Sequence, residues 1–98
     1  MTAQVLDGEL VAAGIKADLA GRVQALIERG ITPGLGTVLV GDDGPSANYV
    51  SMKHRDCEAL GITSHHAHLP SDATQQDVLD VIARFNADPT VDAYLMQY

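Results

Sequence analysis

The stretch TVLVGDDGPSANYVSMK, residues 37–53, decides the fold. Its opening, TVLVG, is a β-branched and apolar run that ends in glycine, and it predicts a short buried strand over 37–41. The polar loop DDGPS follows. Ser46 is predicted to cap a helix that runs from about residue 47 to residue 60 and stops at Gly61. A buried strand followed by a short turn and a helix is typical of an α/β protein.

The alternation of strands and helices extends along the chain in both directions. Apolar spacing predicts helices over 8–29 and 75–87, and apolar runs predict strands over 62–70 and 91–96. The expected caps are Asp7 for the first helix and Asp72 or Thr74 for the last, and Gly30 follows the end of the first. The predicted buried faces comprise Val11, Ile15, Leu19, Val23, Leu26 and Ile27 in the first helix, and Val78, Leu79, Ile82 and Phe85 in the last.

This order, α-β-α-β-α-β with short turns, predicts a parallel sheet flanked by helices and joined by right-handed crossovers. The last predicted strand runs directly to Tyr98, with no turn or helix after it. Ligands of open parallel sheets bind just beyond the carboxyl ends of the strands, so the chain stops where a site is expected to begin. We therefore expect residues 1–98 to be an incomplete N-terminal domain of a longer protein.

Composition excludes several classes of function. The formal net charge is −7 with only six Lys and Arg residues, which argues against nucleic acid as a partner. The N-terminus has no basic segment ahead of an apolar run, and no stretch has eighteen consecutive apolar residues, so we expect a cytoplasmic protein without a membrane partner. The lone Cys57 agrees with this compartment and is expected to pack as a small apolar residue.

Lys53 occupies an unusual position in the predicted central helix. At about 100° per residue it falls on the same narrow arc as Ser46, Val50 and Cys57, with Tyr49 beside it. One interpretation is that the lysine stem lies along the apolar stripe and the ammonium group reaches water. The other is a catalytic amine, because an amine removed from water gives up its proton more readily and suits proton transfer or nucleophilic attack. A phenol ring and an amine near the carboxyl edge of a sheet are also consistent with a small-molecule site.

Other motifs are weaker. Neither G-x-x-x-x-G-K-[ST] nor G-x-G-x-x-G is present, so no nucleotide-phosphate loop is expected in this chain. Asp42 and Asp43 resemble the acidic pair that binds a cation in receiver domains, although a long helix precedes them here. His66 and His68 share one face of a predicted strand, but zinc requires three or four ligands and no second cluster has matching spacing. We expect no metal site.

Several motifs together resemble the bifunctional methylenetetrahydrofolate dehydrogenase/cyclohydrolase family, specifically its N-terminal part. They are LDG (6–8), PGLGTVLVGDDGPSANYVSMKHRDCEALGI (33–62), LP (69–70) and VDAYLMQ (91–97). The most specific block is similar to the family pattern V-G-x-x-x-x-S-x-x-Y-V-x-x-K. The last block is similar to the start of the family's Gln-x-Pro-Leu-Pro motif.

The resemblance implies roles for four residues. Lys53 matches the family's catalytic amine, Gln97 matches the glutamine that supports the protonation state of that lysine, and Tyr49 matches the tyrosine that stacks on the folate ring system. Ser46 would be both a helix cap and a polar support near the reacting centre, as a substrate-binding residue.

The resemblance also implies an activity and its partners. The family oxidises 5,10-methylenetetrahydrofolate with NAD(P)⁺ and hydrolyses the methenyl product to 10-formyltetrahydrofolate, in one-carbon metabolism that supplies purine biosynthesis. NADP would be bound by a nucleotide-binding domain absent from these residues, so this chain alone is expected to lack dehydrogenase activity and to bind folates weakly. The resemblance implies a homodimer for the full-length protein. The alternatives are a non-catalytic interaction module and the receiver-like cation site.

Overall fold

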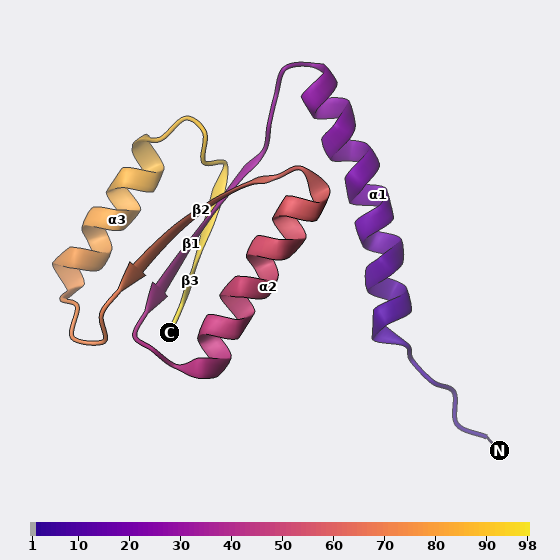
Figure 1. Cartoon of the computed structure of the whole chain (residues 1–98), viewed down its shortest axis with the longest axis horizontal. Coiled ribbons are helices and arrows are strands. Elements are labelled where there is room, and N and C mark those ends of the chain that lie inside the picture. The colour runs from indigo at the N-terminus through magenta and orange to yellow at the C-terminus, as the bar shows by residue number, and fades with distance from the viewer. Residues whose placement is uncertain (1) are drawn as a thin grey trace.

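The computed structural model describes residues 2–98, and Figure 1 shows its helices and strands in alternation. The elements are α1 (Gly8–Glu28), β1 (Gly34–Val40), α2 (Gly44–Leu60), β2 (Thr63–Leu69), α3 (Gln75–Ala87) and β3 (Ala93–Gln97). All three strands of the sheet are parallel, in the order β2-β1-β3. The predicted α/β class, element order and parallel sheet are confirmed.

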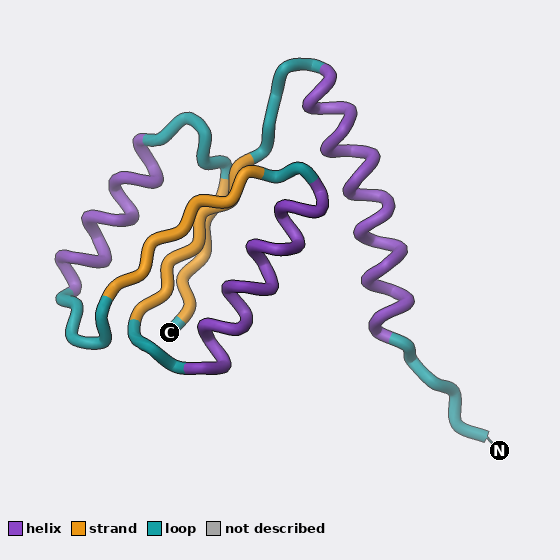
Figure 2. The backbone as a smooth tube through the Cα atoms, in the orientation of Figure 1, coloured by secondary structure: helices purple, strands orange, loops and turns teal. Residues whose placement is uncertain are grey.

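The sheet is covered on both faces by helices. Figures 1 and 2 show α3 on one side of the strands and α2 on the other, with α1 beyond α2 as an outer layer. The central strand β1 is the most buried element, since Val38 is completely buried and Thr37 nearly so. On the α3 face, Val38 and Ala67 form a core with Val81 and Phe85.

Gly36 sets how closely α3 approaches the sheet. A Cβ atom at this position would lie 3.0 Å from Cε2 of Phe85 and 3.1 Å from Cβ of Tyr94. These two rings pack against each other, with centroids 5.9 Å apart. The glycine therefore makes room for the aromatic side of the core, and Tyr94 is placed on the α3 face of β3.

The predicted burial of the first helix is wrong for its N-terminal half. Asp7 caps α1 as predicted, and its carboxylate accepts hydrogen bonds from the amides of Glu9 and Leu10. However, Val11 is 61% exposed and Ile15 is 56% exposed, whereas Val23 is buried. The reason is that α1 packs on α2, and its apolar contact, between Val23 and the Gly61 end of α2, lies in its C-terminal half.

The predicted face of the last helix needs one correction. Thr74 is the cap, in a reciprocal capping box with Asp77. Val81 and Phe85, four positions apart, set the face that meets β1, and Leu79 lies off this face with 45% of its surface exposed.

The start of α2 also differs from the prediction. Its N-cap is Asp43, whose carboxylate accepts a hydrogen bond of 3.0 Å from the amide of Ser46. The helix therefore begins three residues earlier than predicted, and Pro45 lies in its first turn, where a missing amide proton costs nothing. Gly61 ends the helix in a left-handed conformation with φ of 84°, as predicted. Within residues 2–98, no helix is both long enough and apolar enough to cross a bilayer.

Candidate functional site

One face of α2 carries the predicted site residues. Ser46, Val50 and Cys57 are buried in a line along this helix, and Lys53 lies half-buried among them. The predicted apolar stripe and the inward position of Lys53 are therefore confirmed. Tyr49 is 51% exposed, and Nζ of Lys53 lies 5.7 Å from the centroid of its ring. This distance is within the range of a cation–π contact.

Ser46 links the start of α2 to the end of the chain. Its Oγ lies 2.9 Å from Oδ2 of Asp43 and 3.3 Å from the backbone carbonyl oxygen of Tyr98. The single hydroxyl proton is donated to one acceptor at a time, and the shorter contact is to Asp43. Ser46 is thus a buried polar residue inside the first turn of α2, and its hydroxyl is hydrogen-bonded to Asp43, the N-cap of this helix.

Gln97 is placed at the carboxyl end of β3 by the register of the sheet. It pairs with Leu39, and Leu95 pairs with Thr37, so these residues share one face by the alternation of side chains along a strand. Tyr94 and Met96 fall on the other face, with the α3 core. Gln97 therefore belongs to the face of the sheet that α2 covers, and no hydrogen bond within residues 2–98 joins it to Lys53.

The structure thus brings all four predicted residues to one corner of the molecule. Ser46, Tyr49 and Lys53 come from one side of α2, and Gln97 comes from the neighbouring strand end. A half-exposed aromatic ring offers a stacking surface for a flat ligand, and a half-buried amine beside it can hold or transfer a proton. This is the position at which open parallel sheets bind ligands.

Sequence reasoning missed Asp43 and Tyr98 as parts of this corner. Asp43 fixes the Ser46 hydroxyl, and the carbonyl of Tyr98 ties β3 to α2. Pro45 was the available signal for Asp43, because proline is tolerated in the first turn of a helix and places the cap ahead of it. No sequence signal marks the Tyr98 carbonyl, because it is a backbone group whose partner is set by tertiary packing.

Cys57 lies on the same face, but its thiol is not activated as a nucleophile. Only 5% of its surface is exposed, and burial, followed by the nearby Asp56 carboxylate, raises the pKa of the thiol. A raised pKa disfavours the thiolate that would react. The prediction that Cys57 packs as a small apolar residue is confirmed.

The start of α2 carries acidic side chains where a helix N-terminus would meet a phosphate group. Asp42 and Asp43 stand before the helix N-terminus, where a pyrophosphate would have to bind, and two carboxylates repel it. Asp43 is engaged as the cap, while Asp42 lies 3.4 Å from Nε2 of His68. No group of three or more metal-ligating side chains occurs within residues 2–98, and the rings of His66 and His68 lie 6.4 Å apart.

The chain is similar to FolD proteins in both sequence and structure. The bifunctional protein FolD of Syntrophotalea carbinolica is 52% identical over 98 residues, which are 100% of this chain and 34% of that protein. The FolD structure from Campylobacter jejuni matches 97% of this chain and 34% of its own, with a TM-score of 0.91 and 38% identity. The Trypanosoma brucei enzyme, solved with NADP cofactor and an inhibitor, matches 100% of this chain and 34% of its own, with a TM-score of 0.95 and 31% identity.

The chain spans about a third of the length of the relatives that it matches. The family model for the catalytic domain of tetrahydrofolate dehydrogenase/cyclohydrolase matches residues 6–98. The chain therefore belongs to the tetrahydrofolate dehydrogenase/cyclohydrolase family.

Proposed function

We propose that residues 1–98 form the N-terminal, folate-binding part of a bifunctional enzyme. Its reactions are oxidation of 5,10-methylenetetrahydrofolate to the methenyl compound and hydrolysis of that product to 10-formyltetrahydrofolate. The observation that carries the proposal is the half-buried amine of Lys53, 5.7 Å from the Tyr49 ring, on a helix of this family's catalytic domain. The proposal places the protein in the cytoplasm, as a homodimer when full-length, in one-carbon metabolism that supports purine biosynthesis.

Tyr49 and Lys53 have distinct roles in this proposal. The exposed phenol ring of Tyr49 stacks on the folate ring system and fixes its plane. During hydrolysis, water adds to the methenyl carbon, and a carbon–nitrogen bond then breaks as a proton reaches the departing nitrogen. The Lys53 amine accepts a proton from the attacking water and returns one to that nitrogen.

Gln97 and Ser46 support this chemistry. Gln97 lies on the sheet face that α2 covers, at the strand end, where its amide can hydrogen-bond the Lys53 amine and bias its protonation state once substrate is bound. Ser46 holds the start of α2 against the end of β3 through Asp43 and the Tyr98 carbonyl. Both are positioning groups for Lys53 and Tyr49.

In this proposal the nicotinamide cofactor is bound by a part of the protein outside residues 2–98. The acidic pair at the start of α2 does not fit a pyrophosphate, so residues 2–98 supply the folate side of the reaction only. NADP, the cofactor in the Trypanosoma brucei structure, accepts the hydride when bound by another part of the protein. This chain alone is accordingly expected to lack dehydrogenase activity.

Lys53→Gln tests the catalytic assignment. We expect a chimeric enzyme, in which residues 2–98 replace the matching residues of the Syntrophotalea carbinolica FolD, to hydrolyse methenyltetrahydrofolate. Lys53→Gln should lower its kcat by about 100-fold or more, because general acid–base groups contribute roughly 10²–10⁴-fold. Tyr49→Ala should instead raise KM by about tenfold, the loss of one stacking contact.

The matched control is Lys16→Gln, which removes the chain's other lysine. Lys16 lies on α1 and pairs with Asp56 at 3.0 Å, so cyclohydrolase turnover should stay within about twofold of the parent chimera. Turnover of Lys53→Gln as high as that of Lys16→Gln would disprove the catalytic role of Lys53.

A further inference from the structure

The positions of Tyr49 and Lys53 depend on the short turn between β1 and α2. This turn comprises residues 41–43 only. Gly41 has a φ of 90°, which side chains rarely allow, so the chain leaves the strand sharply at this residue. Asp43 then caps α2. Because the turn is so short, any change in its position passes directly to the first turn of the helix.

The side chain of His68 binds this turn to the neighbouring strand β2. Nε2 of His68 lies 2.8 Å from the carbonyl oxygen of Gly41 and 3.4 Å from Oδ1 of Asp42. A carbonyl oxygen only accepts hydrogen bonds, so Nε2 carries a proton and donates it to Gly41. Within residues 2–98, the Gly41 carbonyl accepts no other hydrogen bond. His68 is therefore the group that fixes the direction of this peptide unit.

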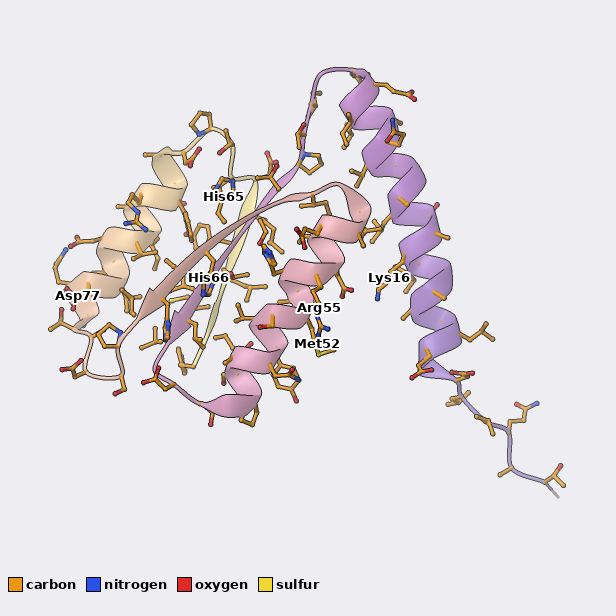
Figure 3. The ribbon with its side chains drawn as sticks, in the orientation of Figure 1. Lys16, Met52, Arg55, His65, His66 and Asp77 are labelled. Atoms are coloured by element: carbon orange, nitrogen blue, oxygen red, sulfur yellow. The ribbon has the colours of Figure 1, made fainter. Side chains whose placement is uncertain are left out.

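The register of the sheet places His68 beside the turn. His68 pairs with Leu39 in the parallel ladder of β1 and β2, one residue before β2 ends. His66, labelled in Figure 3, lies two positions earlier and lines a groove with residues of α2, so this face of β2 is turned toward α2. The imidazole of His68 thus lies on the α2 face, at the end of the sheet where α2 begins.

The start of α2 is also tied to the strand on the other side of β1. Oγ of Ser46 lies 3.3 Å from the backbone carbonyl oxygen of Tyr98, which follows β3. Since the strand order is β2-β1-β3, His68 and Ser46 link the beginning of the helix to both edge strands. Loss of the His68 link leaves the turn held from one side only.

We infer that His68 is a positioning residue for substrate binding, because it fixes the turn that sets the place of the Tyr49 ring. The inference rests on the proposed function, in which this ring stacks on the folate. Tyr49 lies near the start of α2 and is 51% exposed, so the helix backbone is its main support. Lys53 lies further along, between Val50 and Cys57, which are 6% and 5% exposed and held in the core. Loss of the His68 hydrogen bond should therefore disturb Tyr49 more than Lys53.

The first test is the hydrolysis of methenyltetrahydrofolate by the chimeric enzyme described above. His68→Leu keeps much of the bulk of the side chain and removes its N–H donor. KM should rise about fivefold, the effect of one lost hydrogen bond on an equilibrium, and kcat should stay within about twofold of the parent. A variant that was merely less stable would contain less active enzyme, which lowers the apparent kcat and leaves KM unchanged.

A rescue variant and a matched control accompany this test. His68→Gln supplies an amide N–H in about the place of Nε2, so its KM should return to within about twofold of the parent. His65→Leu removes another imidazole of β2, near the start of the strand, where Nε2 lies 3.4 Å from Oγ1 of Thr90. It is remote from the turn and should leave KM within about twofold of the parent.

The second test needs no activity. The amide of Ala47 donates to the carbonyl oxygen of Asp43 at 2.9 Å, in the first turn of α2. In the 98-residue chain, NMR should show hydrogen exchange at Ala47 about fivefold faster in His68→Leu than in the parent, because the turn opens more often. The amides of α3 should exchange at the parental rate.

Three results would overturn the inference. One is a parental KM in His68→Leu, and another is a KM in His68→Gln as high as in His68→Leu. The third is exchange at Ala47 that is accelerated no more than exchange in α3. Failure of the proposed function would show differently, as full turnover in Lys53→Gln, and the exchange at Ala47 does not depend on what the chain binds.

Discussion

His66 shows how a single side chain on an edge strand couples stability to pH. Its pKa lies below the ordinary value of 6.5 because burial beside Thr37 and α2 penalises the charged ring, and His68 and His54 add repulsion. The unfolded chain therefore binds this proton more readily than the folded chain does. The contribution of His66 to stability is complete above about pH 6.5 and is lost as the pH falls toward the lower pKa of the folded state.

We expect the urea midpoint of the 98-residue chain to fall between pH 7.5 and pH 5.5. His66→Asn should show a smaller fall, because it removes the group whose protonation opposes folding. The imidazole signals of His66, followed by NMR, should titrate with a midpoint below 6.5. A His66 midpoint at or above 6.5, together with an unchanged pH dependence in His66→Asn, would refute this account.

At the scale of single residues, the sequence predicted which side chains face the protein interior, but it did not predict the hydrogen bonds between residues far apart in the chain. The inward position of Lys53 followed from helical periodicity, and so did the burial of Cys57. The bond of Ser46 to the Tyr98 carbonyl did not, because it joins residues 52 positions apart. The hydrogen bond between Thr37 and His66 could not be predicted from the sequence either, because it depends on the register of two strands.

At the scale of the element, the start of α2 depends on Asp43. Its carboxylate accepts a hydrogen bond from the Ser46 amide and another from the Ser46 hydroxyl. Both Asp43 and Ser46 are residue types that cap helices, so the sequence allowed either choice. The structure selects Asp43 because Gly44 and Pro45 adopt helical geometry in the first turn.

Asp43→Ala should destabilise the 98-residue chain by about 1 kcal/mol, the usual cost of losing a helix cap. Urea unfolding followed by far-ultraviolet circular dichroism would measure this loss. Asp42→Ala is the matched control, because it removes an adjacent carboxylate that accepts no hydrogen bond from the helix and is 83% exposed at its side chain. Equal destabilisation by the two variants would show that the effect is one of charge and that Asp43 does not cap the helix.

At the scale of the whole molecule, the chain is more extended than its length requires. The radius of gyration is 16.4 Å, whereas a domain of 100 residues is expected at about 13 Å. Figure 1 shows the cause, since α1 stands outside α2 with its N-terminal half away from the sheet. Periodicity predicted which side of α1 is apolar but not whether that side has a partner, because the partner is a property of tertiary structure.

The two halves of α1 should therefore respond differently to substitution. Leu10, Val11 and Ile15 are 71%, 61% and 56% exposed, so changing all three to glutamine should alter the free energy of unfolding by less than about 0.5 kcal/mol. Val23 is 5% exposed and packs near Gly61, so Val23→Ala should cost roughly 1.5 kcal/mol, at about 0.8 kcal/mol for each buried carbon lost. The triple variant should also bind less of the dye ANS, because it removes an exposed apolar patch. If it instead lost as much stability as Val23→Ala, the stripe would have to be buried in solution, and the 98-residue chain would then associate through this face.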